Sequence, residues 1–289
     1  MRQPLTISLF LCGTILVLGQ FVGFPSPAYS MHRRLLILLF CLPVLGSAQT
    51  LNFFGLYPQY SQTGPITKRL NYQLFLSSTI DATSQTIDRQ YYPATNLQVY
   101  AQPSLLYNLS SHVQVGLGYA YVSHNLFGIK VNENRVWAQT VLTHSIGETR
   151  VKMNHRLRYE ERYPFRESTQ RWSLAQLARY YVGATVSLFD PKKTKAGFYA
   201  AVSNEAFLCF SGAKNGPISA KNAFYGEDWV YGGIGYNTGK WGKVEVGYQF
   251  QDLVRNPAQD HRHLHLVQVQ WATNFSLNGI ADWLLTPPF

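Results

Sequence analysis

The sequence predicts an all-β fold: a transmembrane, antiparallel up-and-down β-barrel of about 12 strands, with 10 as the alternative count. Three observations lead to this class. Apolar and polar residues alternate with period two along most of the chain after residue 49. The alternating segments are roughly 10–14 residues long, which matches the ~9–11 residues that a tilted strand needs to cross a membrane. An export signal precedes them.

The composition excludes several other classes. The 289 residues include 25 Lys and Arg against 15 Asp and Glu, a formal charge of +10, yet charged residues are only 14% of the chain and aromatic residues 15%. A disordered chain combines high charge with few aromatic residues, and a coiled coil is rich in Ala, Glu, Lys and Leu. The positive charge is spread along alternate strand positions and forms no patch, so we expect no nucleic-acid partner.

Residues 1–48 are expected to be an N-terminal leader and signal peptide. The basic pair Arg33-Arg34 precedes an apolar run and a small-residue cleavage site, Gly46-Ser-Ala48. We expect translation to start at Met31 and cleavage to follow Ala48. The alternative is that the uncharged stretch 5–24 is a real membrane anchor, since it is long enough to span a bilayer.

The barrel is expected over residues 49–275, followed by a C-terminal extension at 276–289. Apolar residues alternate with polar or small ones in 112–121, 151–160 and 243–251, and helical periodicity is nowhere sustained. We count about eleven such segments by this criterion. They lie near 51–60, 68–79, 95–107, 112–123, 133–144, 149–162, 170–189, 196–208, 225–238, 241–252 and 261–275.

The connections between segments alternate in length. Short turns are expected at 108–111, 145–148 and 237–240, and longer links at 80–94, 124–132, 209–224 and 253–260. Outer-membrane barrels alternate short periplasmic turns with longer extracellular loops in this way. The first and last segments then run in the same direction, which gives an odd count. Bacterial single-chain barrels are normally even, so we expect one further strand within 49–67 or 170–189.

One face of these strands is strongly charged. If Val151, Met153, Leu157 and Tyr159 face lipid, the charged residues between them face the lumen, because lipid-facing Arg or Lys costs roughly 2–4 kcal/mol at the midplane. The same parity on other strands predicts a polar lumen network with no catalytic or cofactor-binding role. Its expected members are Arg135, Lys152, Arg156, Arg158, Glu160, Arg162, Arg171, Arg179, Glu205, Lys243 and Glu245.

Three motifs resemble those of a known family. Asn134-Arg-Val-Trp-Ala-Gln139, Asn154-His-Arg-Leu-Arg-Tyr-Glu-Glu-Arg162 and Ser203-Asn-Glu-Ala-Phe207 look like the barrel family catalogued as domain of unknown function two-four-nine-zero. The likeness covers most of residues 50–275, and Tyr163 stands where the family has Phe. The resemblance implies an exported outer-membrane barrel of Gram-negative bacteria. It transfers no catalytic residue, because the family has no assigned activity.

Three other patterns were weighed for chemistry. His261, His263 and His265 share one strand face and are weak metal candidates, but we expect a polar rim and no bound metal or other cofactor. A lipid hydrolase would need a serine, a histidine and an orienting group together, whereas Asn154 and His155 point to opposite faces. The glycines of 232–239 and Lys240 precede a strand instead of the helix that a phosphate-binding loop requires, so we expect a hairpin turn.

The function expected from the sequence is therefore that of an outer-membrane barrel with a charged lumen, serving as a narrow pore, an envelope-structural element or a binding barrel. Its expected partners are outer-membrane lipid, lipopolysaccharide and, during biogenesis, the barrel-assembly machinery. No enzyme activity is expected. The alternatives are a phospholipase-like outer-membrane hydrolase and a soluble periplasmic ligand-binding β protein. The sequence does not specify an oligomeric state.

Overall fold

The computed structural model describes residues 49–87, 90–126, 129–167, 169–212, 224–256 and 260–276. The leader, the signal peptide and nearly all of the C-terminal extension lie outside the described residues. None of the described residues forms a helix long and apolar enough to span a membrane.

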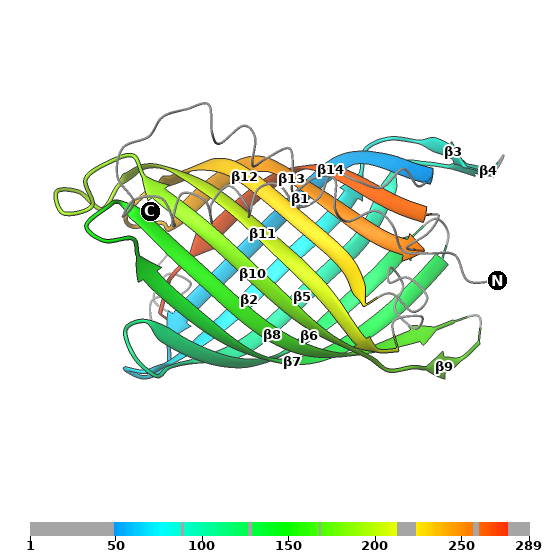
Figure 1. The fold of residues 1–289 in the computed structure, drawn as a ribbon, viewed down its shortest axis with the longest axis horizontal. Helices are drawn as coiled ribbons and strands as arrows, with labels where there is room; N and C mark the ends of the chain where they lie inside the picture. Colours follow the sequence, from blue (N-terminus) through cyan, green and yellow to red (C-terminus); the bar gives the residue numbers. More distant parts are fainter. Residues whose placement is uncertain are drawn as a thin grey trace, which may run out of the picture. The chain divides into compact units, whose positions relative to one another are not determined.

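The described chain is a succession of β-strands (Figure 1). Period-two alternation gives each long strand one apolar and one polar face, and the short turns between them are rich in Lys, Thr, Gly and Ser. The strands are β1 (Gln49–Pro65), β2 (Leu70–Asp81), β3 (Gln85–Ile87), β4 (Gln90–Tyr92), β5 (Thr95–Asn108), β6 (Val113–Leu126), β7 (Ile129–Ser145), β8 (Val151–Arg166), β9 (Arg171–Trp172), β10 (Ala175–Ser187), β11 (Gly197–Ser211), β12 (Tyr225–Asn237), β13 (Lys243–Asn256) and β14 (Asp260–Thr273).

Eleven of these strands close a ring. Its order is β1, β2, β5, β6, β7, β8, β10, β11, β12, β13 and β14, and neighbouring strands are antiparallel except where β14 returns to β1. That closing pair is parallel and runs from Gln49 opposite Asp260 to Gln62 opposite Thr273. The up-and-down barrel is confirmed.

The expected count of about twelve strands corresponds to eleven strands in the described ring and one, β9, outside it. The first and last strands run in the same direction, as the sequence predicts. They therefore pair in parallel where the ring closes. No strand had been missed within 49–67. In 170–189 the expected single segment divides into β9 and β10, but β9 only extends the edge of β8 and lies outside the ring.

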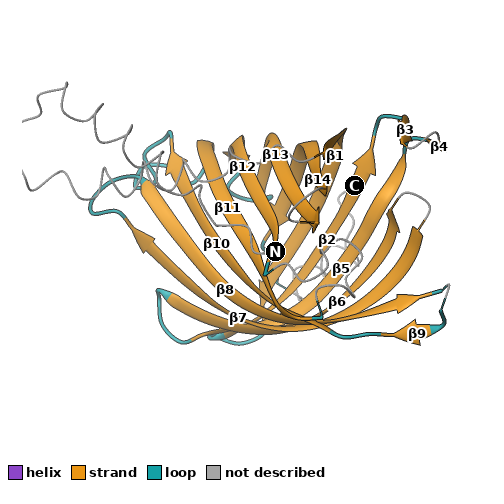
Figure 2. Cartoon of the chain, turned by 45° about the vertical axis from the view of Figure 1, so that its right-hand side comes forward, coloured by secondary structure: helices purple, strands orange, loops and turns teal. Residues whose placement is uncertain are grey.

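The two ends of the barrel differ. At one end, called the turn end below, lie the turns 66–69, 109–112, 146–150, 188–196 and 238–242. At the other, called the loop end, the β3–β4 hairpin and β9 project beyond the ring, on the right of Figure 2. Two of the long links expected there are largely strand, because β6 continues to Leu126, β7 starts at Ile129, and β13 continues to Asn256.

The faces of the ring separate as the alternation predicts. The outer wall is apolar, with Leu117, Leu157 and Ile234 each about 60% exposed or more. The interior toward the loop end holds an apolar group, called the loop-end cluster. It consists of Phe53, Tyr57, Leu97, Leu253, Leu264 and Leu266, with Trp229 packed against it.

Candidate functional site inside the barrel

Glu160 on β8 is the centre of a buried ion-pair network inside the ring. Its side chain is fully buried, and its carboxylate oxygens lie 2.7 Å from Arg179 Nη1 and 2.9 Å from Arg162 Nε. Arg158 Nη1 and Arg135 Nη1 follow at 3.4 and 3.9 Å. A lone buried carboxylate would be strongly disfavoured, so these four guanidinium groups make the burial of Glu160 possible.

A second buried carboxylate extends the network toward the loop end. Glu133 on β7 is fully buried and accepts hydrogen bonds from Arg135 Nε at 2.8 Å and Arg135 Nη2 at 3.3 Å. His124 Nε2 lies 3.0 Å from Glu133 Oε2, and Arg162 Nε lies 3.8 Å from Glu133 Oε1. Glu133 and Glu160 therefore share the guanidinium groups of Arg135 and Arg162.

A third carboxylate extends the network toward the turn end. Glu205 on β11 accepts from Arg156 Nη2 at 2.6 Å and from Arg179 Nε at 2.8 Å. Arg179 thus bridges Glu160 and Glu205 across β8, β10 and β11. A chain of charge-assisted hydrogen bonds between strands opposes any change in their register.

Aromatic rings and glutamines complete the surroundings of the arginines. The guanidinium carbon of Arg158 lies 4.0 Å from the Trp137 ring centroid, and that of Arg179 lies 4.3 Å from Phe207. Arg158 also donates two bonds to Gln139 Oε1, at 2.7 and 3.0 Å, and one to Gln102 Oε1 at 2.9 Å. Stacked aromatic rings and neutral hydrogen-bond acceptors replace the water that a guanidinium group loses when it is buried.

The interior toward the turn end is open by comparison. A cavity of about 550 Å³ runs along the interior: its wall includes glutamines 59, 73 and 270 toward the turn end and extends past the network to His124 and Leu264 toward the loop end. Arg156 at its boundary is 25% exposed, and its Nε has no hydrogen-bond partner. Lys152 and Lys243 are exposed near the turn end of the ring.

The network carries one more positive charge than negative. It contains five arginines, at positions 135, 156, 158, 162 and 179, and four glutamates, at positions 133, 160, 205 and 227. Arg156 is the most exposed of these arginines.

Most residues of the predicted lumen network come together. Arg135, Arg156, Arg158, Glu160, Arg162, Arg179 and Glu205 form the network described above. Glu245 lines the cavity, Lys243 Nζ lies 5.6 Å from the Tyr199 ring, and Lys152 pairs in register with Thr185 in the cavity wall. Arg171 does not join them, because it lies exposed on β9, outside the ring.

Three network members were not predicted. His124 lies where the sequence predicts a link, Glu133 lies at the predicted start of a strand, and Glu227 lies near the start of β12. Glu227 is buried and lies 4.0 Å from Arg162 Nη1. The signal was present, since Glu133 is two positions from Arg135 and Glu227 two from Trp229, so each shares the inward parity.

The histidine side chains of β14 are on the outer face of the barrel wall. His261 and His263 approach Asp252 of β13, whereas His265 is engaged elsewhere, with Nδ1 2.6 Å from Tyr248 Oη and Nε2 3.2 Å from Asn52 Oδ1. The three histidines share a face as expected, but two of them and an aspartate form the group.

The other two patterns behave as expected. Asn154 lines the cavity and accepts from Thr143 Oγ1 at 2.7 Å, whereas His155 is on the outer wall with Nδ1 2.9 Å from Tyr180 Oη. The two residues that suggested a hydrolase are thus on opposite sides of the wall. The glycine-rich segment ends in the β12–β13 turn, where Gly239 and Gly242 adopt positive φ angles of 79° and 87°.

The closed ring, the apolar outer wall and the charged interior define an up-and-down β-barrel with a polar interior. The sequence profile described as "Protein of unknown function (DUF2490)" matches residues 54–262, and the chain belongs to that family. No curated protein matches the chain in sequence. Among solved structures, LpxR from Salmonella typhimurium is similar, with a TM-score of 0.43, 9% identity, and coverage of 70% of this chain and 83% of that one.

Proposed function

We propose that this protein is an outer-membrane β-barrel whose lumen is closed by a buried ion-pair network, so that it serves as a binding or structural barrel and not as an open diffusion pore. One observation carries the proposal. Glu133 and Glu160 lie inside the ring with no exposed side-chain surface. An open aqueous channel would hydrate charged groups in its wall.

The outer wall supports the membrane setting. Exposed leucines, valines and isoleucines cover β5, β6, β8, β12, β13 and β14. Exposed aromatic residues occur toward both ends, for example Trp241 and Trp271 at the turn end and Tyr121 and Phe210 toward the loop end. An apolar band between aromatic girdles is the pattern of outer-membrane barrels. A monomeric soluble protein rarely exposes so much contiguous apolar surface.

The cavity supports a binding role. Its volume of about 550 Å³ lies within the range of small-molecule sites. The surplus positive charge at Arg156 and the glutamine-rich wall suit a small polar solute that carries an anionic group. Arg156 lines the cavity with a partly exposed side chain, which can supply a positive charge to such a solute.

Two measurements test the proposal. Expressed with its own leader, the protein is expected to sediment with the outer membrane and to migrate differently on SDS gels with and without boiling. Reconstituted in planar bilayers, it is expected to show no stable open channel. Recovery from the soluble periplasm would refute the membrane setting, and a steady, large conductance would refute the closed lumen.

A further inference from the structure

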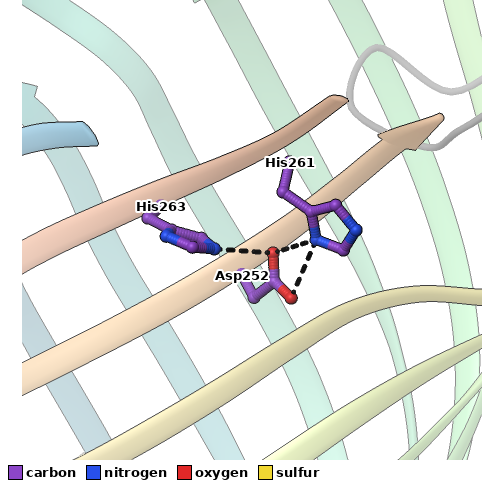
Figure 3. A group of neighbouring side chains, drawn as sticks. All are labelled: Asp252, His261 and His263. Carbon is purple, nitrogen blue, oxygen red and sulfur yellow. Dashed lines mark hydrogen bonds and ion pairs between the residues drawn. The ribbon is translucent and has the colours of Figure 1, made fainter. Parts of the chain in front are cut away.

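We propose that Asp252, His261 and His263 form a binding site for a divalent transition metal of the zinc class on the outer wall of the barrel. Figure 3 shows the three side chains converging from two neighbouring strands. The site is separate from the ion-pair network, since these residues have the outward parity of β13 and β14.

The strand register brings the ligands together. Asp252 of β13 is directly opposite His263 of β14, and His261 lies two residues further toward the loop end on the same face. Diagonal neighbours on one face of an antiparallel pair are within reach of long side chains. The carboxylate of Asp252 can therefore be approached by both imidazoles at once.

The distances are close to those of a three-ligand metal site. His261 Nδ1 lies 2.9 Å from Asp252 Oδ1, and His263 Nε2 lies 3.5 Å from the same oxygen. One ligand atom from each residue lies within 4.8 Å of the others. Ligands of a tetrahedral zinc with bonds of about 2.0–2.1 Å stand roughly 3.4 Å apart. Side-chain rotations that move the ligand atoms by about 1 Å would complete that geometry.

The ligand set determines the class of metal. Imidazole nitrogen suits zinc, copper and nickel, whereas magnesium and calcium prefer sites made of oxygen. Two nitrogens and one carboxylate leave a fourth position for water or another group. The side chains are 18–25% exposed, so an ion can enter from outside the barrel.

A second feature of the same wall favours a bound cation. Asp228 of β12 lies directly opposite Asp252 in register, and both carboxylates are on the outer face. Like charges directly opposite each other destabilise a sheet. Asn204 Nδ2 donates to Asp228 Oδ1 at 2.6 Å, which orients that carboxylate but supplies no positive charge. A divalent ion at Asp252 would offset this repulsion.

Aromatic residues border the site on its turn-end side. The Phe250 ring centroid lies 5.0 Å from that of His263 and 5.3 Å from that of His265. His265 is held by Tyr248 and Asn52. An apolar border limits water around a metal and fixes the ligand rings. His265 is therefore excluded as a ligand and provides a matched control.

The test is metal binding by the refolded barrel, prepared without a polyhistidine tag. Equilibrium dialysis against Zn²⁺ is expected to give one tight site per chain. His261→Ala, His263→Ala and Asp252→Asn are each expected to weaken it by roughly 100-fold or more, since even outer-shell changes cost 10–100-fold. His265→Ala is expected to bind as the wild type does. Co²⁺ bound in the same site should give the intense visible absorption of a four-coordinate centre.

Heat-dependent gel mobility establishes that each variant is folded. If His263→Ala does not fold, His263→Gln takes its place, because an amide can keep a hydrogen bond to Asp252 but is a poor zinc ligand. The proposal is wrong if the wild type shows no saturable Zn²⁺ binding. It is equally wrong if the folded His261, His263 and Asp252 variants bind Zn²⁺ as tightly as the His265 control.

Discussion

The two halves of the barrel interior are built on the same strands but differ in how they are filled. Toward the loop end, Glu133 and Glu160 are fully buried among arginines, and the loop-end cluster packs beside them. Toward the turn end, Arg156 is 25% exposed and Lys152 and Lys243 are exposed, and the cavity of about 550 Å³ that runs along the interior reaches this half. The backbone is continuous between them, so the difference lies in the side chains at inward positions.

Side-chain size and charge pairing explain the contrast. Inward positions of the turn-end half include the small residues Ala201 and Ser203, and the glycines at 183 and 233 are covered by the rings of Tyr181 and Tyr231. Further along β7, β8 and β11 the inward positions hold large residues: Arg158 stacks on Trp137 of the neighbouring strand, and Phe207 is stacked by Arg179. A barrel of this strand number has an intermediate bore, so its inward residues determine whether it is open.

The largest effect is expected from removing the central carboxylate. Glu160→Ala leaves Arg158, Arg162 and Arg179 without their shared partner in a buried setting, and breaking a buried pair in this way costs about 3–5 kcal/mol. Urea unfolding of the refolded barrel measures the loss. Glu161→Ala is the matched control, because Glu161 is the next residue, is only partly buried, and faces outward among Tyr159, Tyr163 and Gln176. Equal losses of unfolding free energy in the Glu160→Ala and Glu161→Ala variants would show that the ion-pair network does not stabilise the barrel.

A smaller effect is expected from adding volume to each half. Ala120 is fully buried against Tyr100 and Val122, so Ala120→Phe should destabilise the barrel by about 1–3 kcal/mol. Ala201 lines the cavity, and Ala201→Phe should be tolerated because the ring has space to enter. The two free energies of unfolding test whether the halves differ in packing. Comparable losses of unfolding free energy in Ala120→Phe and Ala201→Phe would show that the space beside Ala201 is already filled.

The smallest effect is expected at the boundary between the halves. Arg156→Gln removes one partner of Glu205, but Arg179 remains bound to it at 2.8 Å. Since Arg156 is partly exposed, its pair is expected to contribute no more than about 1 kcal/mol. High salt should reduce this difference from the wild type, while the difference for Glu160→Ala should persist because a buried group is little screened. A salt-independent loss as large as that of Glu160→Ala would place Arg156 inside the closed section.

Much of this arrangement could be predicted from alternation alone. Because side chains alternate strictly along a strand, the outward position of Leu157 and Tyr159 fixes the inward position of Arg158 and Glu160. The structure bears out that parity on β7, β8, β10 and β11. The alternating lengths of the connections also gave the shared direction of the first and last strands, and the twelfth strand that an even number required is β9, which lies outside the ring.

The rest depends on information that a single strand does not carry. Arg171 has inward parity only if 170–189 is one strand, and the break at residues 173–174 removes it from the ring. The Asp252 group depends on the register between β13 and β14, which sets Asp252 opposite His263. Parity assigns a residue to a face, whereas register and strand ends decide which residues meet.

The central claim is that the lumen is closed toward the loop end and accessible from the turn end, and cysteine labelling tests it most directly. Single cysteines at Ser203, in the cavity wall, and at Ala120, in the packed half, would be compared after the buried Cys209 is replaced by alanine. The refolded barrel is treated with a charged, membrane-impermeant thiol reagent. The account predicts that Ser203→Cys reacts, whereas Ala120→Cys stays unmodified until the barrel is unfolded. Equal reaction at both positions in the folded barrel would contradict it.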